Sequence, residues 1–358
     1  MQTIEIIPAQ KLSAIDRRLW SEWQATNPDL ASPYFHPEFT QAVARVRDDV
    51  LIAVVRKGNA TAALLPFQRG KLNFGRPVGG KLSDYHGLIA PGDVCVDAQR
   101  LLRACGLAGW DFDHLLASQT AFVASHQTVR PSRIIDLSQG FDAYCAERRA
   151  AGTEAIKKTQ HKARKLEREV GPLRFTTHTE AEAVFEQLRA WKSDQYRRTG
   201  LTDIFEFPWT ANLLRDLLQK SDAEFAGEMS ALWCGDRLAA AMISLRSRQV
   251  LHAWFPAYDP ELAAYSPGMI LFLKLAEEGP TRGITQMDLG TGDERYKLQI
   301  TTPGPLLAQG SLEGGGPAVW LRKGWRTTRS LLESPQRTVA GKSPLQFLQP
   351  LRSWLAFR

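Results

Sequence analysis

The order of secondary-structure signals in residues 172–302 is the feature that most constrains the fold of this chain. Short apolar runs alternate there with longer runs that repeat apolar residues at helical spacing. In chain order we expect a strand at 173–177, helices at 180–199 and 210–221, strands at 229–234, 238–246 and 249–257, a helix at 269–278 and a strand at 285–289. Because sheets and helices bury their apolar faces against each other, this order predicts a layered α+β domain.

The chain before residue 140 carries enough signals for a second domain. We expect a helix over 13–26, a hairpin formed by 50–56 and 60–67, and a strand at 133–137. The stretch 72–92 is rich in glycine and aromatic residues, which predicts a long loop or a binding rim. With 358 residues the chain exceeds what one hydrophobic core usually serves, and this favours two domains.

Residues 141–170 form a strongly charged run between these two regions, with eight Lys or Arg residues and one His. We expect one long helix, acting either as a solvated linker or as a basic rail for an anionic substrate such as a nucleotide sugar, an acyl carrier or tRNA. The expected organisation is a first domain over 1–140, a linker helix over 141–170, a second domain over 171–317 and a tail over 318–358.

The formal net charge of +7 is located in that tail, which has eight basic residues and one acidic residue. Apolar and aromatic residues such as Trp320, Trp325 and Trp354 lie between the basic ones. This pattern is typical of a membrane-surface segment or a docking strip for an acidic partner, for example a polysaccharide synthase, and equally of a solvated tail. Because the rest of the chain is neutral and has no DNA-reading motif, we expect no sequence-specific nucleic-acid binding.

Several function classes are excluded by missing motifs. The four cysteines are far apart and form no CxxC pair, and the histidines have no metal-ligand spacing, so we expect no metal site. The chain has no Walker A loop, no GxSxG and no complete GxGxxG. It has no run of about 20 apolar residues and no basic start followed by an apolar run, so we expect a cytoplasmic protein, with membrane contact only through the tail.

The stretch Tyr265, Ser266, Pro267 and Gly268 opens the helix expected at 269–278. A first helical turn has unpaired N–H groups and the positive end of the helix dipole, so it can hold an anion. Serine as N-cap with proline at the first helical position is also common in ordinary helices. Both interpretations fit the sequence at this point.

Five motifs in order carry a resemblance to a known family. They are HKARKLEREVGPLRF at 161–175, WKSDQYRRTG at 191–200, GDRLAAAMISL at 235–245, AYDPELAAYSPGMILFLKLAEEGPTRG at 257–283 and MDLGTGDERYKLQI at 287–300. Together they resemble the FemAB-like and CelD-like branch of the GNAT acyltransferase superfamily, which is associated with cellulose or exopolysaccharide biosynthesis. The resemblance covers nearly the whole chain and is weaker before residue 140.

The resemblance implies tandem GNAT-like domains, the first one degenerate, and transfer of an acyl group from acyl-CoA to an amine or a sugar in bacterial polysaccharide or cell-envelope biosynthesis. It places the coenzyme A pyrophosphate on Tyr265, Ser266, Pro267 and Gly268. The loop departs from the usual family pattern because proline removes one N–H donor. Two alternatives are a Fem-type transferase that uses aminoacyl-tRNA and a catalytically inert, acyltransferase-like scaffold of a polysaccharide synthase.

Amide formation from a thioester needs a base for the amine, an N–H donor for the oxyanion and a proton for the thiolate. We expect Asp288 to act as the base or to orient the amine, Tyr296 to donate the proton and Lys297 to contact a donor phosphate or sugar. Tyr296 and Lys297 are expected on a loop after a strand that ends near Asp288. The structural alternatives are that Asp288 caps a glycine-rich turn and that Lys297 pairs with Asp293 or Glu294.

Six further residues are candidates for substrate binding because aromatic faces suit sugars and acyl chains and polar tips can orient them. They are Trp191, Arg198, His252, Trp254, Tyr85 and His86. Three of them have a structural alternative: His252 is more often a satisfied structural histidine than a base, and the two tryptophans could belong to the core.

Overall fold

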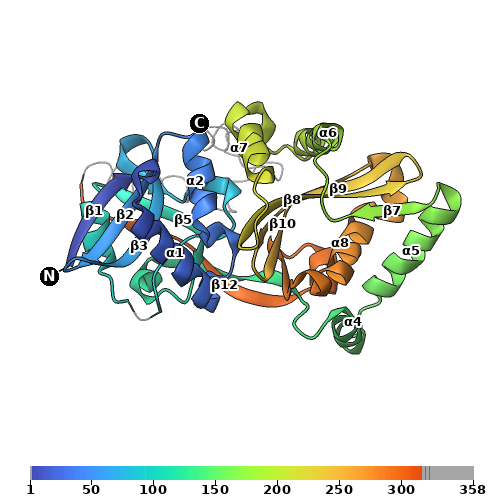
Figure 1. Cartoon of the computed structure of the whole chain (residues 1–358), viewed down its shortest axis with the longest axis horizontal. Coiled ribbons are helices and arrows are strands. Elements are labelled where there is room, and N and C mark those ends of the chain that lie inside the picture. Colours follow the sequence, from blue (N-terminus) through green and yellow to red (C-terminus); the bar gives the residue numbers. More distant parts are fainter. Residues whose placement is uncertain (1, 93, 317–318, 320–321, 323–358) are drawn as a thin grey trace, which may run out of the picture.

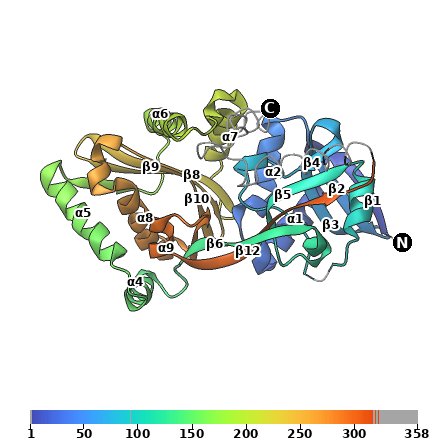
Figure 2. The ribbon, with the colours of Figure 1, turned by 180° about the vertical axis from the view of Figure 1, so that it is seen from behind.

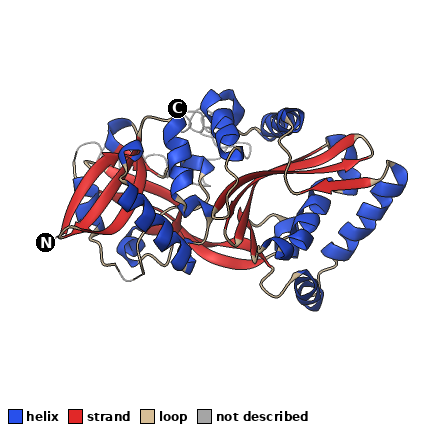
Figure 3. Ribbon diagram, viewed as in Figure 1, coloured by secondary structure: helices blue, strands red, loops and turns tan. Residues whose placement is uncertain are grey.

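One twelve-stranded mixed sheet runs through the whole molecule, with helices on both of its faces (Figures 1 and 3). The structure is a computed structural model that describes residues 2–92, 94–316, 319 and 322. The strand order is β1-β2-β3-β4-β5-β12-β6-β11-β10-β9-β8-β7. The α+β class predicted from the order of elements is therefore observed.

The described elements fall into two halves. The first half contains β1 (Gln2–Pro8), α1 (Ala14–Thr26), α2 (Pro37–Val46), β2 (Val50–Lys57), β3 (Ala60–Arg69), β4 (Phe74–Arg76), α3 (Ala98–Ala104), β5 (Gly109–Leu116) and β6 (His126–Asp136). The second half contains α4 (Phe141–Ala150), α5 (Ala155–Glu169), β7 (Leu173–Thr176), α6 (Glu182–Thr199), α7 (Pro208–Leu218), β8 (Phe225–Cys234), β9 (Arg237–Ser247), β10 (Val250–Tyr258), α8 (Pro267–Glu278), β11 (Gln286–Thr291), α9 (Arg295–Ile300) and β12 (Thr302–Glu313).

The two halves repeat one topology and exchange their last strands. In each half four strands pair antiparallel, and the fourth then pairs in parallel with a fifth, giving β4–β5 and β10–β11. The sixth position beside β5 is filled by β12, and the sixth position beside β11 is filled by β6. Strands β6 and β12 also pair with each other, and they join the two halves at the centre of the sheet (Figure 2).

The core confirms that the halves are packed together. One apolar cluster contains buried residues of α2, such as Phe39, and of α7, such as Leu213. Arg45 of α2 and Asp216 of α7 form an ion pair of 2.6 Å across the same contact. The domain boundary expected near residue 140 stays a prediction, because neither the sheet nor this core is interrupted there.

Most elements expected in residues 172–302 are observed with small shifts of their ends, and so are the helix at 13–26 and the hairpin around residue 58. The single helix expected over 141–170 is wrong. Two helices, α4 and α5, are separated at Gly152, whose φ of +78° is left-handed and ends α4. Helix α5 is not solvated on all sides, because its residues Ile156 and Leu166 are buried against the second half.

Strand β12 and helix α2 were not expected from the sequence. Strand β12 contains Pro303, Gly304, Pro305 and Gly310, all of which argue against a central strand. The register of β12 against β6 shifts between Pro303 and Leu306 and again at Gly310, and these irregularities accommodate the proline and glycine residues.

The basic amphipathic tail expected at 318–358 lies outside the described residues, apart from Val319 and Arg322. Arg322 pairs with Asp111, and its guanidinium lies 4.5 Å from the centre of the Phe74 ring. Among the described residues, none of the helices combines the length and the apolar character needed to cross a membrane.

We predict that Gly310→Ala destabilises the protein by about 1–3 kcal/mol, because the added methyl group would overlap the Ser125 carbonyl oxygen and the Phe112 ring. Denaturant unfolding measures the change. Gly315→Ala is the control, since nothing lies within 4 Å of its added methyl group, and it should change the free energy of unfolding by less than about 0.5 kcal/mol. Equal effects of both substitutions would contradict the placement of β12 between β5 and β6.

Candidate functional site

The parallel strands β10 and β11 separate after a short paired segment. They pair only from Val250 to His252 and from Gln286 to Asp288. Beyond this segment β10 stays paired with β9, but its register shifts between Ala253 and Phe255, which marks a bulge at Trp254. Every second backbone N–H and C=O group of β10 after His252 therefore faces the gap between the strands instead of β11.

A cavity of about 160 Å³ occupies this gap. Its lining residues are Asp84, Ala253, Trp254, Pro256, Phe272, Leu289, Gly290, Thr291, Tyr296 and Lys297. Tyr296 and Lys297 lie on the short helix α9 and not on a loop as expected. The Tyr296 ring stacks on Phe272 of α8 at 6.2 Å between centroids, and burial raises the pKa of Tyr296 to about 12.

Lys297 is held at the edge of the cavity by two contacts. Its Nζ donates a hydrogen bond of 2.8 Å to the Thr291 carbonyl oxygen and lies 3.5 Å from Glu294 Oε2. The predicted pairing of Lys297 with Glu294 is therefore present. The side chain is 10 % exposed, so the ammonium retains little contact with solvent.

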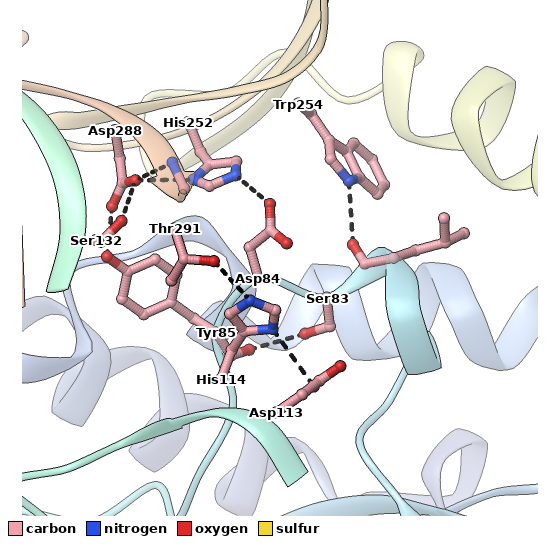
Figure 4. A network of polar contacts seen from close by, with 12 residues as sticks. Ser83, Asp84, Tyr85, Asp113, His114, Ser132, His252, Trp254, Asp288 and Thr291 are labelled. Atoms are coloured by element: carbon pink, nitrogen blue, oxygen red, sulfur yellow. Dashed lines mark hydrogen bonds and ion pairs between the residues drawn. The ribbon is translucent and has the colours of Figure 1, made fainter. Parts of the chain in front are cut away.

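Asp84 reaches the cavity from the first half of the chain. It lies between the short 3-10 helix η5 (Gly80–Leu82) and α3, in the segment expected to form a binding rim. Trp254 Nε1 donates to the Leu82 carbonyl oxygen at 3.0 Å, and Ser83 Oγ donates to the Tyr85 carbonyl oxygen at 2.8 Å. The first bond fixes the segment against β10 of the second half, and the second bond holds the segment's own conformation (Figure 4).

A buried chain of polar groups continues from Asp84 into the protein (Figure 4). His252 Nε2 lies 2.9 Å from Asp84 Oδ2, and His252 Nδ1 lies 3.6 Å from Asp288 Oδ1. Asp288 accepts hydrogen bonds from Tyr85 Oη, from Ser132 Oγ at 2.7 Å and from the Gly290 N–H at 2.7 Å. The expected capping of a glycine turn by Asp288 is thus present.

Charge and burial act against each other in this chain of groups. Burial alone would raise the pKa of Asp84, but the hydrogen bond from His252 and the positive charge of that ring hold it below its ordinary value. Burial, together with the Asp288 carboxylate, raises the pKa of Tyr85 well above its ordinary value. At neutral pH Asp84 is therefore an anion, and Tyr85 is a neutral hydrogen-bond donor.

A second histidine lies on the other side of the Asp84 segment. His114 Nε2 is 3.1 Å from Thr291 Oγ1, and its Nδ1 is 3.4 Å from Asp113 Oδ1. Burial opposes its charge, but the Asp113 carboxylate outweighs burial and raises the pKa of His114. His86 is buried beside it, accepts the backbone N–H of His114 at its Nε2, and has its pKa lowered by burial to about 3. His86 is a neutral structural histidine and does not line the cavity.

Tyr265, Ser266, Pro267 and Gly268 lie together at the start of α8. Ser266 is the N-cap residue and Pro267 the first helical residue, as expected, but the Ser266 hydroxyl makes no capping bond. Its φ of +56° is left-handed, which is unusual for a serine, and its hydroxyl instead accepts a hydrogen bond of 2.8 Å from Lys162 Nζ. Helix α5 thus places a cation at the positive end of α8.

Trp191 and Arg198 line a different cavity from Trp254. This cavity, of about 290 Å³, lies between α6, the end of β10 and the segment that leads to α8. The six residues expected to bind substrate are therefore not in one pocket. Trp254 faces the gap, Tyr85 and His252 are buried behind it, His86 is farther away, and the other two lie beside Tyr258 and Pro260.

Asp84, Lys162, Ser132 and Thr291 were not singled out by sequence reasoning. Asp84 stands next to the candidate Tyr85, and Lys162 lies in the basic motif at 161–175, so the sequence offered a signal for both. Ser132 and Thr291 carry no local signal, because their roles depend on the pairing of β6 with β11. Among the residues that the structure describes, His, Cys, Asp and Glu form no group that could hold a metal ion.

Lys192 of α6 is buried in the second half, and among the described residues no carboxylate lies within ion-pair distance of it. Its Nζ donates to Gln195 Oε1 at 2.9 Å and lies 5.2 Å from the centre of the Tyr196 ring. Burial lowers its pKa to about 8. Below this pH Lys192 is charged in both the folded and the unfolded protein. Because only the folded protein buries this charge away from water, the charge lowers the free energy of unfolding.

We predict that Lys192→Met stabilises the protein at pH 7 by about 1–3 kcal/mol, because it removes a desolvated charge. Between pH 8 and 10.5 the unfolded protein binds a proton that the folded protein does not, so wild-type stability rises with pH there and the gain disappears. Denaturant unfolding at pH 7 and 10 tests this, with the exposed Lys158→Met as control. A destabilised Lys192→Met protein at pH 7 would contradict the account.

Comparison with known proteins identifies the architecture. Residues 154–298 match the family model described as an acetyltransferase (GNAT) domain. The fold is similar to FemX, with a TM-score of 0.57, 10% sequence identity, and 89% of this chain and 99% of that one covered. No curated protein matches the sequence.

Two further solved structures have a similar fold. A tandem GNAT protein from the clavulanic acid biosynthesis pathway has a TM-score of 0.51 at 11% identity, and the match covers 88% of this chain and 100% of that one. The C-terminal domain of a putative lysylphosphatidylglycerol synthetase from Agrobacterium fabrum has a TM-score of 0.51 at 10% identity, with 90% and 100% covered. The chain therefore has the predicted tandem GNAT-like fold, and residues 154–298 of its second half carry the GNAT acetyltransferase domain.

Proposed function

We propose that this protein transfers an acyl group from a thioester donor to an amine, and that the reaction takes place in the gap between β10 and β11. The observation that carries the proposal is the Asp84 carboxylate at the wall of this gap, beside backbone groups of β10 that no strand pairs. A gap of this kind offers N–H donors to a carbonyl oxygen, and the carboxylate offers a base to an amine.

Acyl-CoA is the donor that best suits the second half. Its pyrophosphate would lie at the N-terminus of α8, where Ser266 and Gly268 open the helix and Lys162 adds a positive charge 2.8 Å from Ser266 Oγ. The thioester end would extend into the gap toward Trp254. When bound, acyl-CoA would supply the activated carbonyl carbon, and this chain's own residues would orient it.

Asp84 is our candidate for the general base, in place of Asp288. Asp288 is 1 % exposed and is occupied by three hydrogen bonds, so an acceptor amine would not reach it. Asp84 has a side chain that is 29 % exposed and lines the cavity. It would accept the proton from the attacking nitrogen, while Tyr296 remains the candidate donor of a proton to the thiolate.

Lys297 has a role in this proposal that differs from the one expected from the sequence. Its Nζ lies at the cavity wall and is hydrogen-bonded to the Thr291 carbonyl oxygen. The phosphates would lie at the N-terminus of α8, where Lys162 is the cation that contacts Ser266. We therefore assign Lys297 to the negative charge that develops on the reacting groups, and Lys162 to the donor phosphates.

Aminoacyl-tRNA is a second candidate donor, favoured by the charge of α5. Exposed cations on the same helix as Lys162 include Lys157, Lys158, Arg164 and Lys165. The similarity to FemX and to a lysylphosphatidylglycerol synthetase domain agrees with such a donor, but this similarity is one of fold alone. A role in polysaccharide biosynthesis, the inert scaffold and a membrane or synthase contact through the tail rest on the sequence alone and stay predictions.

We predict that Lys162→Met weakens binding of coenzyme A about tenfold or more, because it removes one charge-assisted contact to phosphate. Isothermal titration with coenzyme A measures the affinity. Lys157→Met, on the exposed side of the same helix, is the control and should bind coenzyme A as the wild type does. If only tRNA binds, and both substitutions weaken it with a strong salt dependence, the donor is aminoacyl-tRNA instead.

We predict that Asp84→Asn lowers turnover by about 10²–10⁴-fold without changing the affinity for the donor. Asparagine keeps the shape of the side chain, but its amide cannot act as a general base. Release of free coenzyme A from acetyl-CoA in the presence of a panel of primary amines gives the rate. Asp136→Asn, an exposed carboxylate at the end of β6, should leave the rate unchanged. An Asp84→Asn enzyme with full activity would rule out this residue as the base.

A further inference from the structure

His252 lies between two carboxylates that come from opposite halves of the chain. Asp84 belongs to the segment after η5 in the first half, and Asp288 belongs to β11 in the second. The imidazole is 0 % exposed, so no solvent competes for its two nitrogens. Nε2 is hydrogen-bonded to Asp84, whereas Nδ1 faces Asp288 Oδ1 at 3.6 Å and has no hydrogen-bond partner among the described residues.

Asp288 is fixed as an acceptor by its own partners. Tyr85 Oη and Ser132 Oγ come from the first half, and the Gly290 N–H closes the turn of β11. All three are donors, so Asp288 remains an acceptor, and its Oδ1 directs negative charge at His252 Nδ1. A lone pair on Nδ1 would be repelled by that charge, which favours a proton on Nδ1.

Among the other groups around His252, the two phenols carry no charge, whereas Lys297 and His114 also lower the pKa of Asp84. The Tyr34 ring is edge-on to the imidazole at 5.0 Å, and the Tyr85 ring is at 6.2 Å. Burial raises the pKa of both phenols well above the ordinary value, so both are neutral. Lys297 Nζ is bonded to the Thr291 carbonyl oxygen, and His114 is bonded to the Thr291 hydroxyl, so neither occupies the His252 nitrogens.

We propose that His252 is a positioning residue, which Asp288 holds in orientation and which in turn keeps the Asp84 carboxylate charged and aimed into the cavity. The inference rests on the proposed function, since it assigns the groups behind the base of that reaction. The order of groups is carboxylate, imidazole, carboxylate, with only Asp84 at the cavity wall. Because the two carboxylates come from different halves, the base is complete only when the halves are joined.

The test is the pH at which Asp84 titrates in wild type and in His252→Gln. Glutamine keeps an N–H donor for Asp84 but has no charge. Burial, which alone would raise the pKa of Asp84, is then opposed by the charges of His114 and Lys297 but no longer by that of His252. Infrared spectra recorded against pH give the protonation of the Asp84 carboxyl group, identified by its absence in Asp84→Asn. We expect its midpoint to rise by about 1–3 pH units in His252→Gln, with a rise in the same direction in Asp288→Asn.

The same shift should appear in the acid limb of kcat/KM, whereas KM for the donor should stay the same. His178→Gln is the control, because His178 accepts the Met229 N–H far from the gap and should leave the midpoint unchanged. An unshifted Asp84 midpoint in His252→Gln overturns the inference, even if acyl transfer is established. A shifted midpoint without any acyl transfer supports the positioning of Asp84 and contradicts the proposed function instead.

Discussion

The pairing of β6 with β12 is the contact on which the rest of the molecule depends. Each of these strands leaves its own half of the chain and completes the sheet of the other half. The exchange fixes the first half against the gap between β10 and β11, and it brings Ser132 of β6 beside Asp288 of β11. A polar network with members from both halves can form only in this arrangement, because each half alone would leave its buried carboxylates or hydroxyls without partners.

The two repeated halves differ beside their parallel strands. In the first half β4 and β5 pair in parallel, but Trp110 and Leu107 pack so closely against Gly75 that a methyl group would not fit there. In the second half the bulge at Trp254 turns β10 away from β11, and a cavity remains. The first half contributes Asp84 to the lining of this cavity, and the expectation that the first half is a degenerate copy stays a prediction.

The sequence predicted the fold class and most elements of the second half, since their hydrophobic periodicity is regular and their turns contain glycine. It did not predict β12, whose prolines and glycines are compatible with a strand only through shifts of register. Tyr296, Lys297 and Trp254, which were expected in catalysis or substrate binding, line one cavity, and the carboxylate that lines it with them is that of Asp84 and not that of Asp288. Periodicity reports which face of a strand is buried, and it does not report that a residue some 170 positions away completes the site.

The most direct test of the account is a crystal structure of the protein with acetyl-CoA. We expect the pyrophosphate at the N-terminus of α8 beside Lys162 and the thioester between β10 and β11, with its carbonyl carbon next to a space that Asp84 faces. Coenzyme A bound instead in the cavity lined by Trp191 and Arg198, or in the first half, would contradict the claim that acyl transfer takes place in the gap.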